Sequence, residues 1–489
     1  MPSAVFAITG TSAIMEKNNF TADQRAAITA KGHAAVIAGA GSGKTLVLIE
    51  RFRHLLSSGV PVHRIAAFTF TEKGAGEIRE RLSSGGIIRD EEIATAAIGT
   101  IHSFFTRLLR RHGPLLGLDP DFRILGEAGQ ELALNAKLND FLLARLAGNN
   151  PVILKYAARF GFKRLSLLIR KLLAEPRLVY AQFAVPGDAA DLIGEAAAFF
   201  NGWLEEKIAS ATLNYDDLEF LSLRLLDRFP EVREGTARRF THILVDEFQD
   251  TNLFQAGLIR RLFDPAVNHL FIVGDPKQSI YRFRRADVSI FRETTALIKK
   301  IGGDLVNLHE TFRLAPALTD AVNRVFQPLF GDFVPMKPVK ADPGLLEIVI
   351  GREEGVRDIA ALRKNEALWI ARKIASLNLH PSEHGECALL FRTSAPMAIY
   401  KEELSRRGIP CRVTRSESLF ENQQILDFLK IISYLAGNTA ALTQAGIMRS
   451  SFFDLSENFI GHFIALNTPH FLAPHTAGLF ETDEDRYKW

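Results

Sequence analysis

The chain has 489 residues, of which 47% are hydrophobic and 24% charged, as in soluble globular proteins of about two to four domains. A formal net charge of +3 excludes a polycation, so any nucleic-acid surface must be a local patch. Two isolated cysteines make neither a metal site nor a disulfide framework, which favours a reducing compartment such as the cytoplasm. Residues 1–15 lack lysine and arginine, and no segment is a convincing membrane span, so we expect neither a signal peptide nor membrane insertion.

The first strong signal is a glycine-rich turn between an apolar run and a helical pattern. Residues 34–38 are apolar and predict a buried strand, and three glycines, Lys44 and Thr45 follow. Glycines let consecutive N–H groups point at one oxyanion, and the helix N-terminus adds its positive dipole end. Lys44 can reach the β- and γ-phosphates, and the Thr45 hydroxyl can hold Mg²⁺. We therefore predict a phosphate cradle, rather than an ordinary turn with a chance lysine, in Gly39, Ala40, Gly41, Ser42, Gly43, Lys44 and Thr45.

Further apolar strands alternate with helical segments along the first 315 residues. This alternation predicts an α/β fold with a parallel sheet and crossover helices, and ligands then bind beyond the carboxyl ends of the strands. The strands that we expect in addition to 34–38 are 65–70, 94–98, 241–245, 269–273 and 305–308.

Polar side chains follow several of these strands. Asp246 and Glu247 end the strand at 241–245, where one carboxylate can hold Mg²⁺ and the other can orient or deprotonate a water. Tyr281, Phe283 and Arg284 interleave aromatic and basic character, as in a single-strand stacking platform. The same spacing also fits an amphipathic turn with both rings in the core, and the stretch alone leaves the two alternatives open.

The rest of the chain divides by composition. Residues 105–226 are rich in Leu, Ala, Arg and Glu at helical spacing and predict an inserted helical subdomain. A second α/β unit follows, with helices at 366–377 and 399–407 and strands at 387–392 and 411–414. From residue 423 onward the pattern is helical again.

Taken together, these segments resemble the UvrD/Rep family of superfamily 1 DNA helicases, and within it the AddA/RecB helicase–nuclease branch. The resemblance covers nearly all of the chain and is carried by AGAGSGKT at 38–45, FTFTEKGAGEIRERL at 68–82, GTIHSF at 99–104, VDEFQDTN at 245–252, VGDPKQSIYRFRRADVSIF at 273–291, LHETFR at 308–313, NEALWIARKI at 365–374 and ALLFRTS with EELSRRGIPCRV within 388–413.

The resemblance implies two RecA-like lobes that bind ATP between them, each with a helical insertion. In this chain it places a first RecA-like P-loop NTPase lobe at 1–104 and 227–315, its helical insertion at 105–226, part of a second RecA-like lobe at 316–422, and the start of that lobe's insertion at 423–489.

The resemblance also implies roles for individual residues. Gln24 matches the adenine reader, Lys44 and Thr45 the phosphate and Mg²⁺ ligands, and Asp246 a second Mg²⁺ ligand. The expected catalytic residues are Glu247 as the base, Gln278 as the link between the γ-phosphate and DNA, and Arg313 as an arginine finger. The residues expected to touch single-stranded DNA are Thr69, Thr71, Thr100, His102, Tyr281, Phe283 and Arg284.

This sequence departs from the family pattern in two respects. The arginine-finger motif Asn-Tyr-Arg-Ser is replaced by Thr-Phe-Arg-Leu at 311–314, and neither the later motifs of the second lobe nor a nuclease motif are recognisable. The Thr-Arg-Ser at 414–416 lies too early in the chain to be the last of them. We therefore expect the N-terminal portion of a longer protein, which on its own would be an incomplete motor.

The resemblance implies an ATP- and Mg²⁺-dependent motor that moves 3′ to 5′ on single-stranded DNA and unwinds duplex in double-strand-break repair or recombination, with a partner subunit of a helicase–nuclease complex. The alternative is a non-motor DNA-binding subunit that keeps the fold without the chemistry. The intact Lys44, Asp246, Glu247 and Gln278 argue against that alternative.

Overall fold

A computed structural model describes residues 4–8, 20–84, 90–174, 188–331, 333–350, 358–377, 379–380, 385, 387–413, 423–437, 440–457 and 459–461. The chain forms two compact units, one made of residues 14–347 and the other of residues 1–13 with 348–489.

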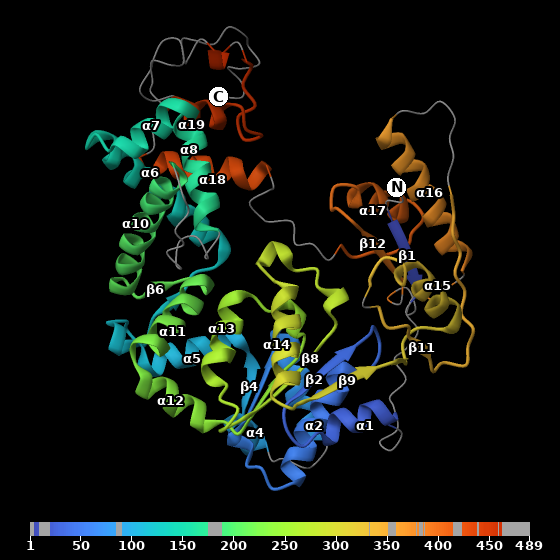
Figure 1. The fold of residues 1–489 in the computed structure, drawn as a ribbon. Helices are drawn as coiled ribbons and strands as arrows, with labels where there is room; N and C mark the ends of the chain where they lie inside the picture. Colours follow the sequence, from blue (N-terminus) through green and yellow to red (C-terminus); the bar gives the residue numbers. More distant parts are fainter. Residues whose placement is uncertain are drawn as a thin grey trace. The chain divides into compact units, whose positions relative to one another are not determined.

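The larger unit is built on a six-stranded sheet in which every pair of neighbouring strands is parallel (Figure 1). In spatial order its strands are β4 (Ala97–Thr100), β3 (Ile65–Thr69), β7 (His242–Val245), β8 (His269–Gly274), β2 (Ala34–Ala38) and β9 (Asp304–Leu308). The predicted α/β fold with a parallel sheet is confirmed. The strand predicted at 94–98 begins three residues later than expected because Asp90–Thr95 forms a helix, α4.

Helices cover both faces of this sheet, which explains why the strands are almost continuously apolar. One core cluster joins the sheet to the first four helices, and a second joins it to later helices. The first group is α1 (Ala22–Thr29), α2 (Lys44–Ser57), α3 (Glu72–Ser84) and α4. The second group is α5 (Ile101–His112), the C-terminal half of α10 (Asp188–Ala209), α11 (Tyr215–Arg228), α12 (Pro230–Arg239), α13 (Leu253–Leu262) and α14 (Val288–Lys300).

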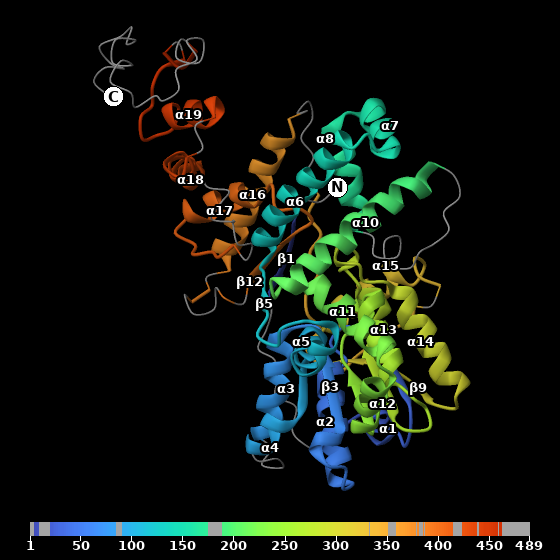
Figure 2. The ribbon, with the colours of Figure 1, turned by 90° about the vertical axis from the view of Figure 1, so that its left-hand side faces the viewer.

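In the described part of the chain between α5 and α11, four helices form a group with its own hydrophobic core (Figure 2). They are α6 (Glu127–Ala147), α7 (Pro151–Phe160), α8 (Phe162–Leu173) and α10 (Asp188–Ala209). Short parallel strands β5 (Arg123–Ile124) and β6 (Thr212–Leu213) pair where the chain leaves and re-enters this group. The helical insertion predicted at 105–226 is therefore narrower, because α5 and α11 bury their apolar faces against the sheet.

Short elements connect these helices and strands. They are the single turns η1 (Val62–Arg64), η2 (Gly113–Leu116), η3 (Phe248–Asp250), η4 (Pro276–Gln278) and η5 (Arg282–Arg284), helix α15 (Pro316–Phe326), and the paired strands β10 (Glu310–Thr311) and β11 (Lys337–Pro338). Within the described ranges, no helix is long and apolar enough to cross a bilayer.

In the smaller unit, β1 (Ala4–Ile8) pairs antiparallel with β12 (Cys387–Phe391). Helices α16 (Ile359–Ser376) and α17 (Met397–Ser405) pack together with β12 in one core cluster, and α18 (Gln423–Leu435) and α19 (Ala441–Met448) follow.

Two predicted boundaries change. Residues 1–13 group with the smaller unit rather than with the first lobe, because β1 finds its partner there, and residues 316–347 group with the larger unit. Residues 411–413 form no strand, and the last residue of that predicted strand, Thr414, lies outside the described ranges.

Candidate active site

The loop between β2 and α2 has a backbone that only glycine adopts readily. Gly41 and Gly43 have φ angles of +73° and +85°, in the left-handed region. A Cβ atom on Gly41 would lie 2.4 Å from the Cβ of Arg313, so a side chain is excluded there by space as well. Helix α2 begins at Lys44 and has no side-chain cap, which leaves its first-turn N–H groups for an anion. The loop therefore fits a phosphate group.

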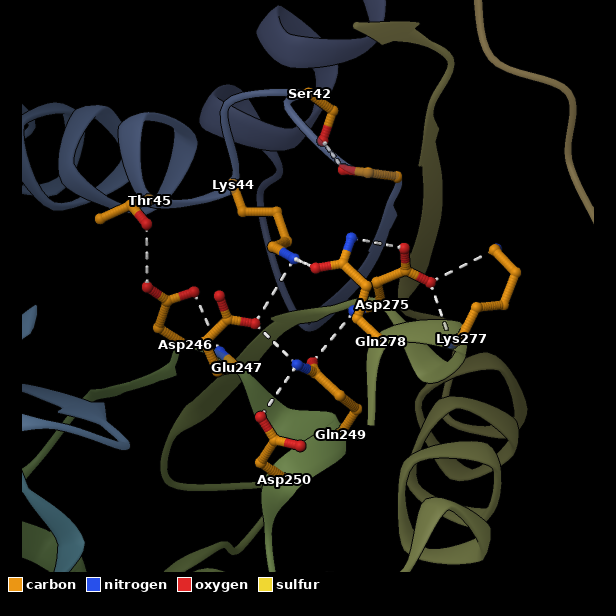
Figure 3. Close-up of polar contacts among 11 residues, drawn as sticks. Ser42, Lys44, Thr45, Asp246, Glu247, Gln249, Asp250, Asp275, Lys277 and Gln278 are labelled. Atoms are coloured by element: carbon orange, nitrogen blue, oxygen red, sulfur yellow. Dashed lines mark hydrogen bonds and ion pairs between the residues drawn. The ribbon is translucent and has the colours of Figure 1, made fainter. Parts of the chain in front are cut away.

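Lys44 lies where three segments meet, as Figure 3 shows. Its Nζ is 3.2 Å from Oε1 of Gln278 and 3.4 Å from Oε2 of Glu247, and its side chain is only 10% exposed. Glu247 follows β7 and Gln278 follows β8, and β7, β8 and β2 are neighbours in the sheet. The fold thus brings together three of the predicted site residues at the carboxyl edge of the sheet.

Thr45 and Asp246 form a second contact across the same edge. The Thr45 hydroxyl donates to Oδ2 of Asp246 at 3.2 Å, and Oδ1 of Asp246 accepts from the Glu247 N–H at 3.0 Å (Figure 3). Burial, and secondarily the charge of Glu247, raise the pKa of Asp246 to about 6. A hydroxyl and a carboxylate are hard oxygen donors of the type that Mg²⁺ prefers, so this pair fits the metal.

Glu247 is held by a residue to which the sequence analysis assigned no role. Nε2 of the buried Gln249 donates to Oε2 of Glu247 at 2.7 Å, and its Oε1 accepts from the N–H of Asp275 at 3.0 Å. Asp275 in turn accepts from Nε2 of Gln278 at 2.9 Å. The polar chain therefore links the ends of β7 and β8. The sequence feature that could have pointed to Gln249 is its position within VDEFQDTN. The residues around it do not distinguish it from a surface glutamine.

Gln24 lies against the phosphate loop and is 1% exposed. Its Nε2 donates to the carbonyl of Ser42 at 3.0 Å, and its Oε1 accepts from the Thr21 N–H as half of a capping box at the start of α1. Both ends of the amide hold the protein backbone. The structure thus places this predicted adenine reader beside the loop and gives it a structural role there.

The segment before Arg313 is bonded to the phosphate loop. The Thr311 hydroxyl donates to the carbonyl of Ala40 at 2.8 Å, and the Phe312 N–H donates to the carbonyl of Gly41 at 2.9 Å. The Arg313 side chain is exposed. Threonine at position 311, which departs from the family's asparagine, therefore anchors this segment through its hydroxyl.

Three aromatic rings form a row beyond the ends of β3 and β8. The ring centroids of Phe70 and Tyr281 are 4.9 Å apart, and those of Tyr281 and Phe283 are 5.7 Å apart. The Arg284 guanidinium lies 5.7 Å from the Tyr281 centroid and 6.0 Å from that of Phe283. Phe283 is 77% exposed, which removes the core alternative for this residue. Sequence reasoning missed Phe70, which directly follows β3.

The other four predicted DNA contacts differ in accessibility. Thr69 and Thr100 are buried, and Thr100 caps α5 by accepting from the Ser103 N–H at 3.1 Å. The exposed Thr71 accepts from the Gly74 N–H at 3.0 Å. His102 is 33% exposed at its side chain. Thr71 and His102 are therefore the two of this group whose side chains a ligand can reach.

Comparison with known proteins gives a consistent assignment. The model of the UvrD/REP helicase N-terminal domain matches residues 20–299, and that of the UvrD-like helicase C-terminal domain matches residues 306–482. The expectation that only the N-terminal portion of the family pattern is present is not confirmed, because the second domain is matched as well.

Two relatives illustrate the similarity. ATP-dependent DNA helicase UvrD1 of Mycobacterium tuberculosis (strain ATCC 25618 / H37Rv) is 30% identical over 432 residues, which cover 84% of this chain and 51% of that protein. ATP-dependent DNA helicase PcrA of Staphylococcus aureus (strain NCTC 8325 / PS 47) is 26% identical over 428 residues, which cover 86% of this chain and 54% of that protein. The chain thus spans about half the length of these relatives. It belongs to the UvrD/REP helicase family.

Proposed function

We propose that the chain is an ATP-dependent DNA helicase that translocates on single-stranded DNA, with Mg²⁺-ATP as its cofactor. The observation that carries this proposal is the arrangement around Lys44, whose Nζ contacts both Glu247 and Gln278 while the neighbouring Thr45 contacts Asp246. A phosphate-binding lysine, a carboxylate for water and a pair of metal ligands thus share one edge of the sheet. The relatives' names, which describe ATP-dependent DNA helicases, support the same activity.

In this proposal the loop at 39–43 and Lys44 bind the phosphates, and Thr45 with Asp246 hold Mg²⁺. The metal ion would neutralise charge on the phosphates. Glu247 orients the attacking water and accepts its proton. Lys44 contacts both Glu247 and Gln278, so a γ-phosphate held by Lys44 would compete with these two side chains for its ammonium group. Arg313 supplies a positive charge from the segment bonded to the loop.

Single-stranded DNA would bind along the aromatic row. Exposed rings with a guanidinium beside them stack on bases with little dependence on base identity. Gln278 precedes Tyr281 by three residues. A change in the contact between Lys44 and Gln278 would therefore be passed to the stacking residues through a short segment of chain. We place Thr71, His102, Tyr281, Phe283 and Arg284 on this DNA path, with Phe70 added from the structure.

The finer assignment is to the AddA/RecB-like branch, on the basis of the segments at 99–104 and 281–287. Within that branch we expect 3′ to 5′ movement, a role in double-strand-break repair or recombination, and association with a nuclease carried by a longer form of the protein or by a partner subunit.

The test is phosphate release from Mg²⁺-ATP by the purified chain, with and without oligothymidylate, followed by strand displacement on duplexes with a 3′ or a 5′ tail. The proposal expects stimulation by DNA and displacement from the 3′-tailed substrate. Nucleotide binding without any hydrolysis would favour the non-motor alternative, and absence of nucleotide binding would refute the assignment.

A further inference from the structure

The start of helix α11 contacts two segments of the proposed DNA path. The Tyr215 ring packs edge-on against His102, with 5.2 Å between centroids. The Asp216 carboxylate accepts from the guanidinium of Arg285 at 2.9 Å. Arg285 lies two residues after Phe283 of the aromatic row, and His102 belongs to the segment after β4. The first turn of α11 therefore lies beside two segments that we assign to DNA.

This turn is fixed in place from the other side. Nζ of Lys207, on α10, lies 2.9 Å and 2.8 Å from the two carboxylate oxygens of Asp217, which is 1% exposed. Asp217 also completes a capping box with Asn214 at the start of α11. The position of the turn is thus set independently of the DNA-facing residues.

Glu219, one turn further along, carries a buried carboxylate that accepts four contacts. Its Oε1 lies 2.8 Å from Nε2 of Gln255, 2.9 Å from Nδ2 of Asn252 and 3.0 Å from Nε2 of His102, and its Oε2 lies 3.1 Å from Nδ2 of Asn252. The Glu219 side chain is 2% exposed, against 33% for His102. A buried carboxylate is costly without its donors, so the three donor side chains are held together by it. Of the Glu219 and His102 side chains, His102 is the one that a ligand can contact, so a ligand would act on the Glu219 carboxylate only indirectly.

The other two donors belong to the nucleotide side of the site. Asn252 and Gln255 form the capping box that starts α13, and the tight turn η3 separates them from Glu247. The Asp250 N–H donates to the carbonyl of Glu247 at 3.0 Å, so a hydrogen-bonded turn joins the carboxylate segment to the cap. A small cavity is lined by residues of both sides, among them His102, Glu247 and Gln255.

We propose that Glu219 is a positioning residue that ties His102, on the DNA-facing edge, to the segment 246–252 of the nucleotide site, so that contact of His102 with DNA changes the setting of Glu247. The inference rests on the proposed helicase function. It adds a second connection between the DNA path and the nucleotide site, separate from the one that runs from Lys44 through Gln278. Glu219 itself touches neither nucleotide nor DNA.

The decisive variant is Glu219→Gln, which keeps the shape but removes the charge and turns one acceptor oxygen into a donor that faces the donor groups. Asp227→Asn is the matched control, because Asp227 lies on the same helix and its carboxylate pairs with Arg261 away from the site, at 2.7 Å and 2.6 Å. Both proteins are compared with the unchanged chain for phosphate release with and without oligothymidylate. Hydrogen exchange of the peptide covering 246–256 is followed in parallel.

In the unchanged chain, oligothymidylate should slow exchange in the 246–256 peptide and stimulate turnover. Glu219→Gln should lose the exchange response and reduce the stimulation about 10-fold, a typical size for coupling between sites, while its unstimulated rate changes less. Asp227→Asn should behave like the unchanged chain. Glu219→Asp, which retains a carboxylate, should recover part of the response.

A Glu219→Gln protein with full stimulation and an unchanged exchange response would overturn the inference, as would a drop in stimulated and unstimulated rates by the same factor. If Glu219→Gln does not fold, Gln255→Met removes one donor without changing the carboxylate and should lower the stimulation in the same direction. An unchanged chain that does not bind DNA would instead refute the proposed function. An unchanged chain that binds DNA without an exchange response at 246–256 would refute the inference alone.

Discussion

Lys44 and Glu247 form an ion pair, with 3.4 Å between Nζ and Oε2. The lysine that we assign to phosphate and the carboxylate that we assign to water thus carry opposite charges in direct contact. A phosphate that binds at the loop would compete with this carboxylate for Lys44. Variants of Lys44 and Glu247 therefore separate phosphate binding from water activation.

Lys44→Ala should weaken ATP binding about 10- to 100-fold, because a charge-assisted contact to phosphate is worth roughly 1.5–3 kcal/mol. The measurement is titration with ATP and Mg²⁺ by calorimetry, with far-ultraviolet circular dichroism as a check on folding. Lys300→Ala, at the exposed C-terminal end of α14, is the control. An unchanged affinity in a folded Lys44→Ala protein would remove the phosphate assignment.

Glu247→Gln should keep ATP binding and lower turnover about 10²- to 10⁴-fold, the range expected for loss of a general base. The amide retains the shape of the side chain and its place beside Gln249, but it cannot accept a proton. Turnover is measured as phosphate release, and Glu293→Gln, whose partner is Arg260 on the surface, is the control. Turnover within threefold of the unchanged chain would show that another group serves as the base.

Replacement of both Tyr281 and Phe283 by alanine should weaken binding of single-stranded DNA by about 1–3 kcal/mol per lost stack. Fluorescence anisotropy with labelled oligothymidylate measures the loss at two salt concentrations, and the remaining basic contacts should still respond to salt. Alanine at Phe326 and Phe330, a stacked pair on α15 and just after it, with centroids 5.9 Å apart, is the control. Unfolding of the Tyr281/Phe283 variant would instead support a structural role for these rings.

His242 should make the folded state sensitive to acid. Burial, then the neighbouring His269 and Arg51, lower the pKa of His242 to about 4. Since the unfolded chain binds the proton more tightly, the stability that His242 contributes is fully present above pH 6.5 and is lost as the pH falls towards 4. Replacing His242 by Asn should therefore flatten the dependence of the thermal midpoint on pH between 7 and about 4.5.

Other groups also titrate between pH 4 and 7, and their effect is removed by comparing the His242 variant with the unchanged chain. Burial also lowers the pKa of His33 and of His269, whereas the pKa values of Asp246 and Asp250 are raised to about 6 and act in the opposite direction. The difference between the variant and the unchanged chain isolates His242. His63→Asn, at an exposed position, is the control. Parallel curves for the unchanged chain and the His242 variant would contradict the prediction.

The sheet and the phosphate loop could be predicted because local chemistry determines them. Residues 34–38 form β2 with the predicted bounds, since an apolar run followed by glycines at positive φ has few alternatives. The pairing of β1 with β12 could not be predicted, because it joins segments near residues 6 and 389 and has no local pattern. The start of β4 was displaced because the apolar residues before it also suit helix α4.

The candidate site was predictable in its residue types and less so in its side-chain contacts. Gln24 and Thr100 were assigned to ligands by the family resemblance. In the structure Gln24 completes the capping box of α1 and Thr100 caps α5, which depends on where these two helices begin. Gln249 and Glu219 were not singled out, because a buried polar role exists only once β7, α11 and α13 are packed together. The helical pattern over 105–226 predicts that Glu219 lies on a helix, but it does not predict which side chains surround it.

Glu247 has φ and ψ angles of 48° and 43°, a left-handed conformation that is unfavourable for a glutamate by roughly 1–2 kcal/mol. Asparagine tolerates this conformation far better, so Glu247→Asn would relieve local strain while removing the proposed base. A search for heat-resistant variants that ignored turnover would therefore tend to discard this glutamate. Selection for activity is what would keep it in place, and libraries built on this chain should be screened for hydrolysis before they are ranked by melting temperature.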